Sequence, residues 1–405
     1  MKKWFSIAAA VVLCLALVIG IACGGEEDEE GVTELKFGFG VPLTGFVSLV
    51  GTATRVAMEM AAEDIGVFEV GGEQYRWKCY YEDNKYSTEG GVASTNKLIF
   101  ERGVDFVLQS GDVPGIPAAM ITEEIPMILE IGAGSASLFG PDLPHTFLAY
   151  FCWDLSHPVT MDWVMKNHPE IKVVCITTDE TPTGEASRAI WQAVCDYHGL
   201  ELHSVVAPSG TVEYYPIATK MMTHDPDLIA GSFTGLTEAM WDFGYDGMVI
   251  TSFFPEAAAK RAGWDKHAEK NRFGTGHIVY ALHPYGGAFP KLDAIKEEYE
   301  HRTGTEFGPN AAWPASSLYV WTDALQQAGT VDDIEKIVET FESGADFESL
   351  AGPVHYGLGE YIGIPHIMIY PVPIIEMVGE EEYVVHKIYS ADEAEAVFLE
   401  IYRGR

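Results

Sequence analysis

Apolar residues along this chain fall into short continuous runs that alternate with longer stretches of helical spacing. In the first half, the pattern predicts strands at Leu35–Val41, Tyr75–Tyr81, Val104–Leu108 and Pro126–Leu129. Helices are predicted between them, at Gly51–Ile65, Thr88–Phe100 and Ile116–Glu124. Strands that alternate with helices in this way indicate βαβ units. We therefore expect a parallel sheet with helices on both faces.

The same alternation continues through the second half. Helices are predicted at His157–Lys166, Gly184–His198, Tyr214–Thr223, Leu236–Phe243, from Pro255, and at Leu292–His301, Ala312–Ala328 and Val331–Ser343. Strands are predicted at Val173–Thr177, Leu202–Ala207, Leu228–Ser232, Met248–Ser252 and His277–Leu282, with hairpins inside His366–Tyr389. Two consecutive α/β units predict two lobes. Because no Pro/Ser-rich linker separates them, several short connections are expected.

Two of these helices carry finer expectations. The spacing within Gly184–His198 places four side chains toward the core, namely Ile190, Ala193, Val194 and Tyr197. Thr330 precedes Val331–Ser343 and is the expected N-cap of that helix, because threonine hydroxyls accept from free N–H groups there.

The N-terminus has the features of an export signal. Met1-Lys2-Lys3 is positive, Trp4 to Ala22 is one apolar run without a charge, and Gly20-Ile21-Ala22 precedes Cys23. Such a segment resembles a bacterial lipobox, so residues 1–23 are predicted to be a lipoprotein signal with an acylated Cys23. Three residues before the cysteine, a lipobox usually has leucine, and this chain has Gly20. An uncleaved membrane helix or ordinary secretion remains an alternative.

Charge narrows the partners. The chain has 405 residues and a formal net charge of −35, which repels nucleic-acid phosphates and anionic lipids. We expect no nucleic-acid partner, and membrane contact through the lipid anchor only. The acidic stretch within residues 24–32 reads as a solvated tether that carries no chemistry.

Four cysteines follow the signal, at Cys79, Cys152, Cys175 and Cys195. They form no C-x-x-C pair, so a zinc or dithiol site is not expected. Buried free thiols are the favoured interpretation, although export permits disulfides.

Five short segments, in order, resemble the branched-chain amino-acid (Leu/Ile/Val) binding proteins of ABC transporters, which have the type I periplasmic-binding-protein fold. They span roughly residues 33 to 390 and are Leu35–Gly45 with its Pro-Leu-Thr-Gly turn, Tyr81–Asn84 followed by Asn96–Ile99 and Gly103–Asp105, Glu123–Ile128, Asp179–Gly184 and Pro226–Ile229. A lipoprotein signal in front is also what this family would show.

The resemblance implies an α/β fold of two Rossmann-like lobes joined by a three-crossing hinge, with a ligand cleft between them. Residues 33–152 plus 281–352 would form one lobe, and 153–280 plus 353–405 the other. The protein would be an anchored, extracytoplasmic monomer. It would capture an amino acid, amide or small aromatic acid without a cofactor and deliver it to ABC permease subunits.

In this family, the loops after the first-lobe strands hold the ligand carboxylate through backbone N–H groups and hydroxyls. The matching loops here are 109–113 and 132–135. They supply Ser110, Gly132, Gly134 and Ser135, although glycine-rich strand ends are equally ordinary turns. Asp112 would repel an anion there unless it points away or binds an amine.

The second lobe would add an acid for the ammonium group and aromatic walls. Glu256 occupies the acidic position and Phe233 could be a wall, while Thr183 and Val50 stand where the family has tyrosines. Phe46 and Trp313 could refill that space. For Glu256 the alternative is a carboxylate that favours a helix start, and for Phe46 and Trp313 it is ordinary core.

Catalytic motifs are not apparent. Ser135 directly follows Gly134, so this stretch is not a G-x-S-x-G elbow, and neither a Walker A sequence nor H-E-x-x-H occurs. The sequence therefore predicts a binding protein without enzymatic activity. A ligand-binding sensor subunit and an exported hydrolase are the alternatives.

Overall fold

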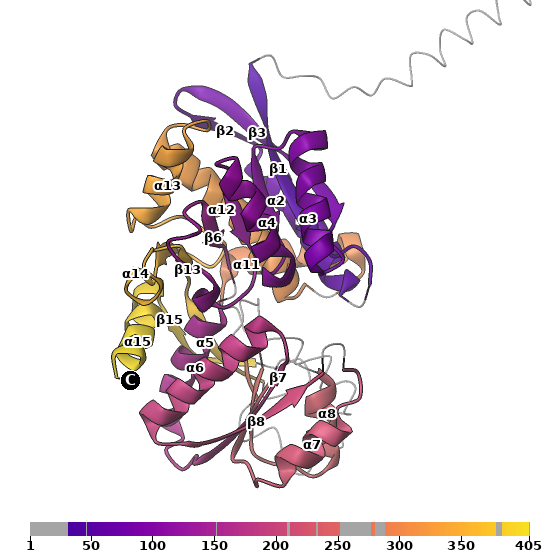
Figure 1. The fold of residues 1–405 in the computed structure, drawn as a ribbon, viewed down its shortest axis with the longest axis vertical. Coiled ribbons are helices and arrows are strands. Elements are labelled where there is room, and N and C mark those ends of the chain that lie inside the picture. The colour runs from indigo at the N-terminus through magenta and orange to yellow at the C-terminus, as the bar shows by residue number, and fades with distance from the viewer. Residues whose placement is uncertain are drawn as a thin grey trace, which may run out of the picture.

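The computed structural model describes residues 31–45, 47–150, 152–208, 211–231, 234–251, 277–279, 288–305, 307–377 and 383–404. They form two α/β lobes, one above the other in Figure 1. The predicted signal and Cys23 lie outside the described residues.

The first lobe is built on an eight-stranded sheet of order β12-β13-β6-β5-β4-β1-β3-β2. Its strands are β1 (Val32–Val41), β2 (Val67–Val70), β3 (Glu73–Asp83), β4 (Phe106–Gln109), β5 (Leu129–Ile131), β6 (Thr146–Leu148), β12 (His355–Gly357) and β13 (Ile367–Ile369). Strands β3, β1, β4, β5 and β6 run parallel, so their carboxyl ends meet at one edge. The outer pairs, β2 with β3 and β12 with β13, are antiparallel.

Both faces of this sheet are covered. The helices are α2 (Ser48–Ile65), α3 (Thr88–Asn96), α4 (Asp112–Glu124), α11 (Pro290–Thr303), α12 (Pro309–Ala328), α13 (Ile334–Glu342) and α14 (Gly359–Ile362), with a π-helix at Lys97–Arg102 and a 3₁₀ turn at Ala136–Leu138. On β1, Phe37 packs on Trp321 of α12 at 5.4 Å between ring centroids. On the other face, a Cβ at Gly38 would lie 3.1 Å from Leu98. The alternation of Phe and Gly along β1 thus places bulk on one face and allows close approach on the other.

The second lobe has a seven-stranded sheet of order β15-β14-β11-β10-β9-β7-β8. Its strands are β7 (Val173–Asp179), β8 (Glu201–Ala207), β9 (Leu228–Ala230), β10 (Met248–Thr251), β11 (His277–Val279), β14 (Val372–Met377) and β15 (Tyr383–Tyr389). Its helices are α5 (Trp153–Asn167), α6 (Pro182–His198), α7 (Tyr215–Met222), α8 (Thr234–Asp242) and α15 (Ala391–Arg403). Val174 and Ile176 join the same core as Trp191 of α6, whereas Cys175 joins the core under α7 and α8. The predicted sheet with helices on both faces is confirmed.

Among the described strands, the chain passes between the two sheets three times, from β6 to β7, from β11 to β12 and from β13 to β14. The last passage differs from the predicted boundary at residue 353. Strand β13 pairs with the exposed edge of β6, Ile367 opposite Leu148, and β12 pairs with β13. Residues 355–369 therefore belong to the first lobe, and the last passage lies at Tyr370–Pro371.

Several finer predictions differ from the structure. The predicted helix Thr88–Phe100 changes to a π-helix at Lys97, which leaves Phe100 67% exposed. Tyr197 is not inward but 40% exposed, and its hydroxyl donates to Glu400 of α15 at 2.7 Å. The N-cap of α13 is Asp333, which accepts from the N–H of Lys336. The four cysteines that follow the signal are free thiols, as favoured from the sequence, and three of them are buried.

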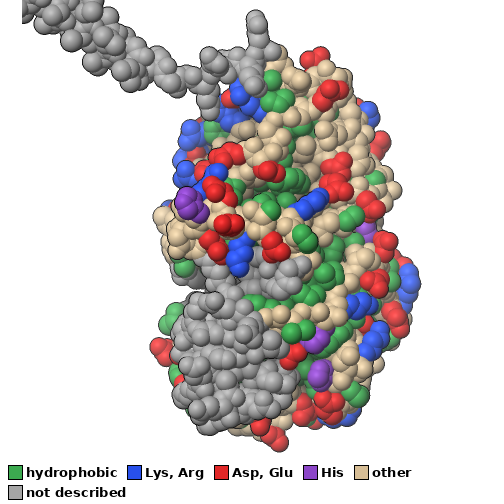
Figure 2. All heavy atoms as spheres, turned by 180° about the vertical axis from the view of Figure 1, so that it is seen from behind, with side chains coloured by type: hydrophobic (Ala, Val, Ile, Leu, Met, Phe, Trp, Pro, Cys, Tyr) green, Lys and Arg blue, Asp and Glu red, His purple; other side chains and the backbone are tan. Residues whose placement is uncertain are grey.

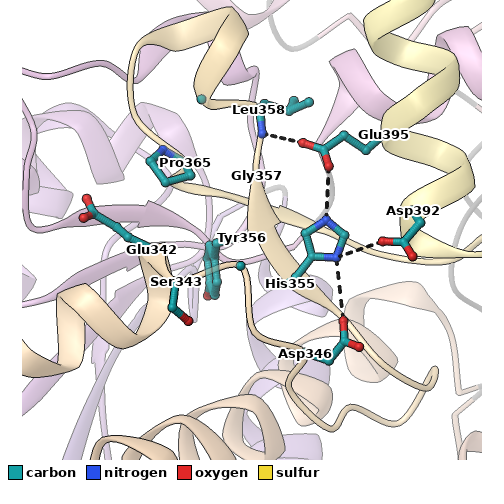
Figure 3. Close-up of a pocket in the computed structure, with 12 residues that line it drawn as sticks. Glu342, Ser343, Asp346, His355, Tyr356, Gly357, Leu358, Pro365, Asp392 and Glu395 are labelled. Carbon is teal, nitrogen blue, oxygen red and sulfur yellow. Dashed lines mark hydrogen bonds and ion pairs between the residues drawn. The ribbon is translucent and has the colours of Figure 1, made fainter.

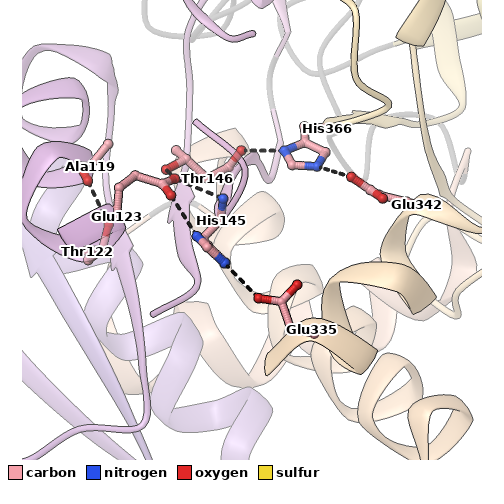
Figure 4. Close-up of polar contacts among 8 residues, drawn as sticks. All are labelled: Ala119, Thr122, Glu123, His145, Thr146, Glu335, Glu342 and His366. Atoms are coloured by element: carbon pink, nitrogen blue, oxygen red, sulfur yellow. Dashed lines mark hydrogen bonds and ion pairs between the residues drawn. The ribbon is translucent and has the colours of Figure 1, made fainter. Parts of the chain in front are cut away.

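Polar contacts fix the start of β6, just before the first passage (Figure 4). Glu123, near the end of α4, accepts from the His145 N–H at 2.8 Å and from the Thr146 hydroxyl at 2.8 Å. The Thr146 carbonyl contacts His366 at 3.0 Å, and the other ring nitrogen of His366 lies 2.8 Å from Glu342 of α13. These contacts tie α4, α13 and the β13 approach to β6.

Glu130 of β5 is a fully buried acid in the first lobe. Its oxygens accept from the Ser317 hydroxyl at 2.6 Å and the Tyr356 hydroxyl at 3.0 Å. Burial raises the pKa of Glu130 to about 7 from an ordinary 4.5. The folded state therefore holds a proton that the unfolded state has released. This contribution to stability is full below the ordinary pKa and disappears as pH rises through 7.

Replacing Glu130 by glutamine should remove this pH dependence, because glutamine stays neutral. Between pH 5 and pH 8, the difference in unfolding free energy between wild type and Glu130→Gln should move by about 2–3 kcal/mol in favour of the variant. Chemical denaturation at both pH values measures it. Glu339→Gln, on the exposed side of α13, is the control. Equal differences at both pH values would contradict a raised pKa at Glu130.

Candidate functional site

The carboxyl ends of the parallel strands in the two lobes face one another. Tyr86 follows β3 of the first lobe and is half-buried. Two carboxylates disfavour ionisation of its hydroxyl through their negative charge. They belong to Asp112, at the start of α4, and Asp179, at the end of β7 in the second lobe. Burial, with these two charges, raises the pKa of Tyr86. Open α/β sheets bind ligands at such strand ends, so this is the candidate ligand cleft.

A buried amide network holds the first-lobe strand ends in register. The Asn84 side chain donates to the Gly40 carbonyl at 2.8 Å and to Gln109 Oε1 at 3.0 Å. Gln109 in turn donates to the Thr95 hydroxyl at 2.8 Å. Asn84 Oδ1 also accepts from the N–H of Tyr86 at 2.9 Å. The ends of β1, β3 and β4 thus form one rigid support beneath the cleft.

Tyr86 stands in an unusual backbone conformation. Lys85 and Tyr86 have φ values of 52° and 50°, in the left-handed region that non-glycine residues rarely occupy. Its ring lies against Gly111, where an added Cβ would be 2.9 Å from the ring carbon Cε2. Because Gly111 has φ 143° and precedes Asp112, this contact sets the entry into α4.

The predicted loop 132–135 lies beside Asp112. A Cβ at Gly134 would be 3.2 Å from the Asp112 Cβ, and one at Gly132 would be 2.4 Å from the Tyr150 hydroxyl. Both glycines are therefore needed for close packing. Their position at the carboxyl end of β5 agrees with the expected place, and contact with a ligand stays a prediction.

The two predicted hydroxyls are engaged by the scaffold. Ser135 is fully buried, and its hydroxyl donates to Asp154 of α5 at 2.7 Å. Asp154 also accepts from the N–H of Ala136. Ser110 is 9% exposed, and its oxygen lies 3.5 Å from the Asn84 amide. Ser135 thus links the first lobe to the helix that follows the first passage.

Trp313 lies at the hinge. Its ring stacks at 6.3 Å on Tyr150, just before the first passage, and meets Tyr370, at the last passage, edge-on at 4.5 Å. The Tyr370 hydroxyl donates to the Cys152 carbonyl at 3.1 Å and accepts from the Cys152 N–H at 3.2 Å. Trp313 is 3% exposed, so it is core as well as hinge.

The other predicted residues divide in two groups. Val50 is half-buried in the first turn of α2, and Thr183 stands in the first turn of α6, beyond the Asp179 end of β7. The remaining predicted residues, Phe46, Phe233, Glu256 and the lipidation site Cys23, lie outside the described residues.

Of the seven buried side-chain polar atoms without a hydrogen-bond partner among the described residues, three belong to predicted site residues. Asp112 Oδ2, Thr183 Oγ1 and Trp313 Nε1 are each buried and find no hydrogen-bond partner among the described residues. Such atoms are costly unless a ligand or water satisfies them. Tyr86, Tyr150 and Asp179 were missed from the sequence. Only Asp179, a strand-end acid in a segment already noticed, gave a usable signal.

A second concavity of ≈ 540 Å³ lies away from the cleft, between β12, the end of α13 and α15 (Figure 3). His355 lies at its centre. One ring nitrogen is 3.2 Å from Glu395, and the other is 3.9 Å from both Asp346 and Asp392. The hydrogen bond that His355 donates to Glu395 raises the pKa of His355. Within the described part of the chain, no group of His, Cys, Asp and Glu residues is arranged to hold a metal ion.

Residues 34–361 match the family described as periplasmic binding protein. The chain belongs to this family. The relationship predicted from the five segments is therefore confirmed. None of the described helices is long and apolar enough to cross a membrane.

Solved structures share the fold of this periplasmic binding protein. A leucine-binding protein, LivK, from Thermotoga maritima is 18% identical over 89% of this chain and 99% of its own, with a TM-score of 0.72. A solute-binding protein of an ABC transporter from Rhodopseudomonas palustris, in complex with 3,4-dihydroxybenzoic acid, is 18% identical over 88% and 98%, with a TM-score of 0.69.

An amino-acid ABC transporter substrate-binding protein from Pseudomonas fluorescens is 15% identical over 88% of this chain and 96% of its own, with a TM-score of 0.72. No curated protein matches the chain. At these identities, the likeness establishes the two-lobed fold.

Proposed function

We propose that this periplasmic binding protein is the extracytoplasmic solute receptor of an ABC importer. It captures a small molecule between its lobes and delivers it to a permease. The observation that carries the proposal is that each lobe has an unpartnered buried polar atom beyond a strand end, Asp112 Oδ2 at the start of α4 and Thr183 Oγ1 in the first turn of α6. The structural relatives, named as binding proteins of ABC transporters, support the same role.

Hinge bending would convert capture into a signal for the permease. Short passages between lobes allow rotation with little change inside each lobe. Ligand contacts made by both lobes favour the closed form, because the ligand shifts the equilibrium by its differential affinity. We place the protein outside the cytoplasm, in the periplasm or on the outer cell surface, where a lipid on Cys23 anchors it to the cell membrane. The sensor and hydrolase alternatives gain no support from the relatives.

Ligand-induced stabilisation of residues 24–405 tests this function. A ligand at 100 times its Kd should stabilise the protein by about 2.7 kcal/mol, and thermal unfolding against amino acids, amines, amides and aromatic acids measures it. Small-angle scattering should show compaction with the same ligand. If no compound in the panel shifted the unfolding temperature, the solute-receptor proposal would be overturned.

Glu256→Ala checks the predicted second-lobe acid. If Glu256 binds a ligand cation, its loss should lower affinity about tenfold or more, as for a hydrogen bond to a charged group. The unfolding temperature of the free protein verifies that the variant folds. Unchanged affinity would remove Glu256 from the site and leave the cleft itself in place.

A further inference from the structure

Asp112 occupies the strand-end position where the family resemblance places an anion-binding loop. It is the first residue of α4, directly beyond the carboxyl end of β4, and only 5% exposed. Its side chain lies over the next strand end, since a Cβ at Gly134 would be 3.5 Å from Asp112 Oδ2. That oxygen is buried and has no hydrogen-bond partner among the described residues. The carboxylate therefore offers an unused acceptor at the cleft.

The surroundings of Asp112 compensate its charge only in part. Backbone N–H groups of Asp112 and Val113 favour the ionised carboxylate, as expected at a helix start. No Lys, Arg or His of the described residues forms an ion pair with it, and the nearby charge is another carboxylate, Asp179. Burial raises the pKa of Asp112 to about 6, so the group is ionised at neutral pH.

An anionic ligand group is disfavoured at this place. Two like charges within a desolvated cleft repel, and the free acceptor on Asp112 would stay unsatisfied. A cationic amine has the opposite effect on both counts. It neutralises the carboxylate and donates a hydrogen bond to Asp112 Oδ2, the acceptor that has no partner among the described residues.

We propose that the ligand carries a cationic amine and that Asp112 binds this amine at the first-lobe strand ends. The inference rests on the solute-receptor function and names its substrate class. It reverses the polarity expected from the resemblance, because the first lobe then holds the ligand cation where the family holds a carboxylate. Tyr86, packed on Gly111, forms the neutral wall beside Asp112.

Calorimetric titration with matched probes tests the polarity. Isoamylamine carries only the cation, isocaproate only the anion, and leucine both; benzylamine and benzoate form an aromatic pair. The amines are expected to bind and the acids without an amine are not. In Asp112→Asn, an isosteric variant, the affinity for the amines should fall tenfold or more. Asp142→Asn removes an equal charge from an exposed turn and should leave affinity unchanged.

A pH profile gives a second readout. Protonation of Asp112 competes with the amine, so amine affinity in the wild type should fall about tenfold per pH unit below 6, as for loss of one required charge. The Asp112→Asn variant should lose this dependence. Thermal unfolding of the free variant confirms that it folds.

The possible outcomes distinguish failure of this inference from failure of the proposed solute-receptor function. Binding of isocaproate or benzoate without the amines would overturn the cationic ligand and leave the importer role standing. Amine binding that is unchanged in Asp112→Asn would overturn the assignment of Asp112. Absence of any binding across all probes and the wider panel would overturn the receptor function and this inference together.

Discussion

Replacing Trp313 by alanine should destabilise the protein by about 3–5 kcal/mol, the usual cost of removing a buried tryptophan, and should also weaken ligand binding. The side chain is 3% exposed and packs between Tyr150 and Tyr370. Those two tyrosines flank the first and last passages between lobes. The cavity left by the substitution would therefore open at the hinge, where it loosens the geometry of closure as well as the core.

Trp321→Ala is the matched control for Trp313→Ala. Trp321 is also fully buried, but its ring packs on Phe106 at 4.4 Å inside the first lobe, away from the passages. Both variants should lose similar unfolding free energy in urea, whereas only Trp313→Ala should lose ligand affinity and ligand-induced compaction. Equal affinity in the two variants would contradict a hinge role for Trp313.

The architecture was predictable because it depends on local patterns. Buried parallel strands require nearly continuous apolar runs, and the covering helices require helical spacing, so both are visible in the sequence. The alternation of Phe and Gly on β1 is one such case, since Phe37 fills one face while Gly38 admits Leu98 on the other.

The features that were missed depend on distant partners. Strand β13 pairs with the edge of β6, more than two hundred residues earlier in the chain. No local pattern distinguishes this pairing from one in which the same residues join the second sheet. Likewise, Tyr197 has inward spacing on α6, but its hydroxyl reaches Glu400 of the unpredicted helix α15. A tyrosine tip can be satisfied at the surface when a long-range acceptor is present.

The strand-end loops of the candidate site were predictable from the sequence, and the contacts of their side chains were not. Strand-end positions follow from the βαβ order, which is why 109–113 and 132–135 fall where expected. Roles within them depend on the approach of the two lobes. Ser135 has the chemistry of a ligand donor, yet it donates to Asp154, because α5 brings that carboxylate to the hinge. Asp112, which fits the resemblance least, carries an unpartnered buried oxygen.

The C-terminal helix α15 connects both lobes outside the three passages (Figure 1). Toward the first lobe, Glu395 accepts from the Leu358 N–H at 2.8 Å, and Arg403 donates to Glu360 of α14 at 2.8 Å. Toward the second lobe, α15 packs against α5 and α6. Phe398 lies at the centre of the helix, 1% exposed, with its ring 5.1 Å from that of Tyr361.

Phe398→Ala should cost about 3–4 kcal/mol of unfolding free energy through the cavity that it creates. Because α15 contacts both lobes, the substitution should loosen the arrangement of the two lobes relative to each other as well as the packing within them. Acidic side chains are spread over both lobes on the face drawn in Figure 2, and the chain's net charge of −35 opposes compact states. Salt should therefore restore part of the stability of this variant by screening that repulsion.

Urea denaturation of wild type and Phe398→Ala at low and high salt measures both effects, and scattering of the free proteins reports the separation of the lobes. Val397→Ala, a half-buried neighbour on the same helix, is the control and should lose about 1 kcal/mol or less, since it removes only two methyl groups at a site that is already partly wet. If Phe398→Ala has the scattering profile of the wild type and loses no more unfolding free energy than the control, then α15 packs on the second lobe without restraining the two lobes relative to each other. A larger loss with expanded scattering would mean that the helix restrains hinge opening, because the passages alone would then no longer hold the lobes at their native separation.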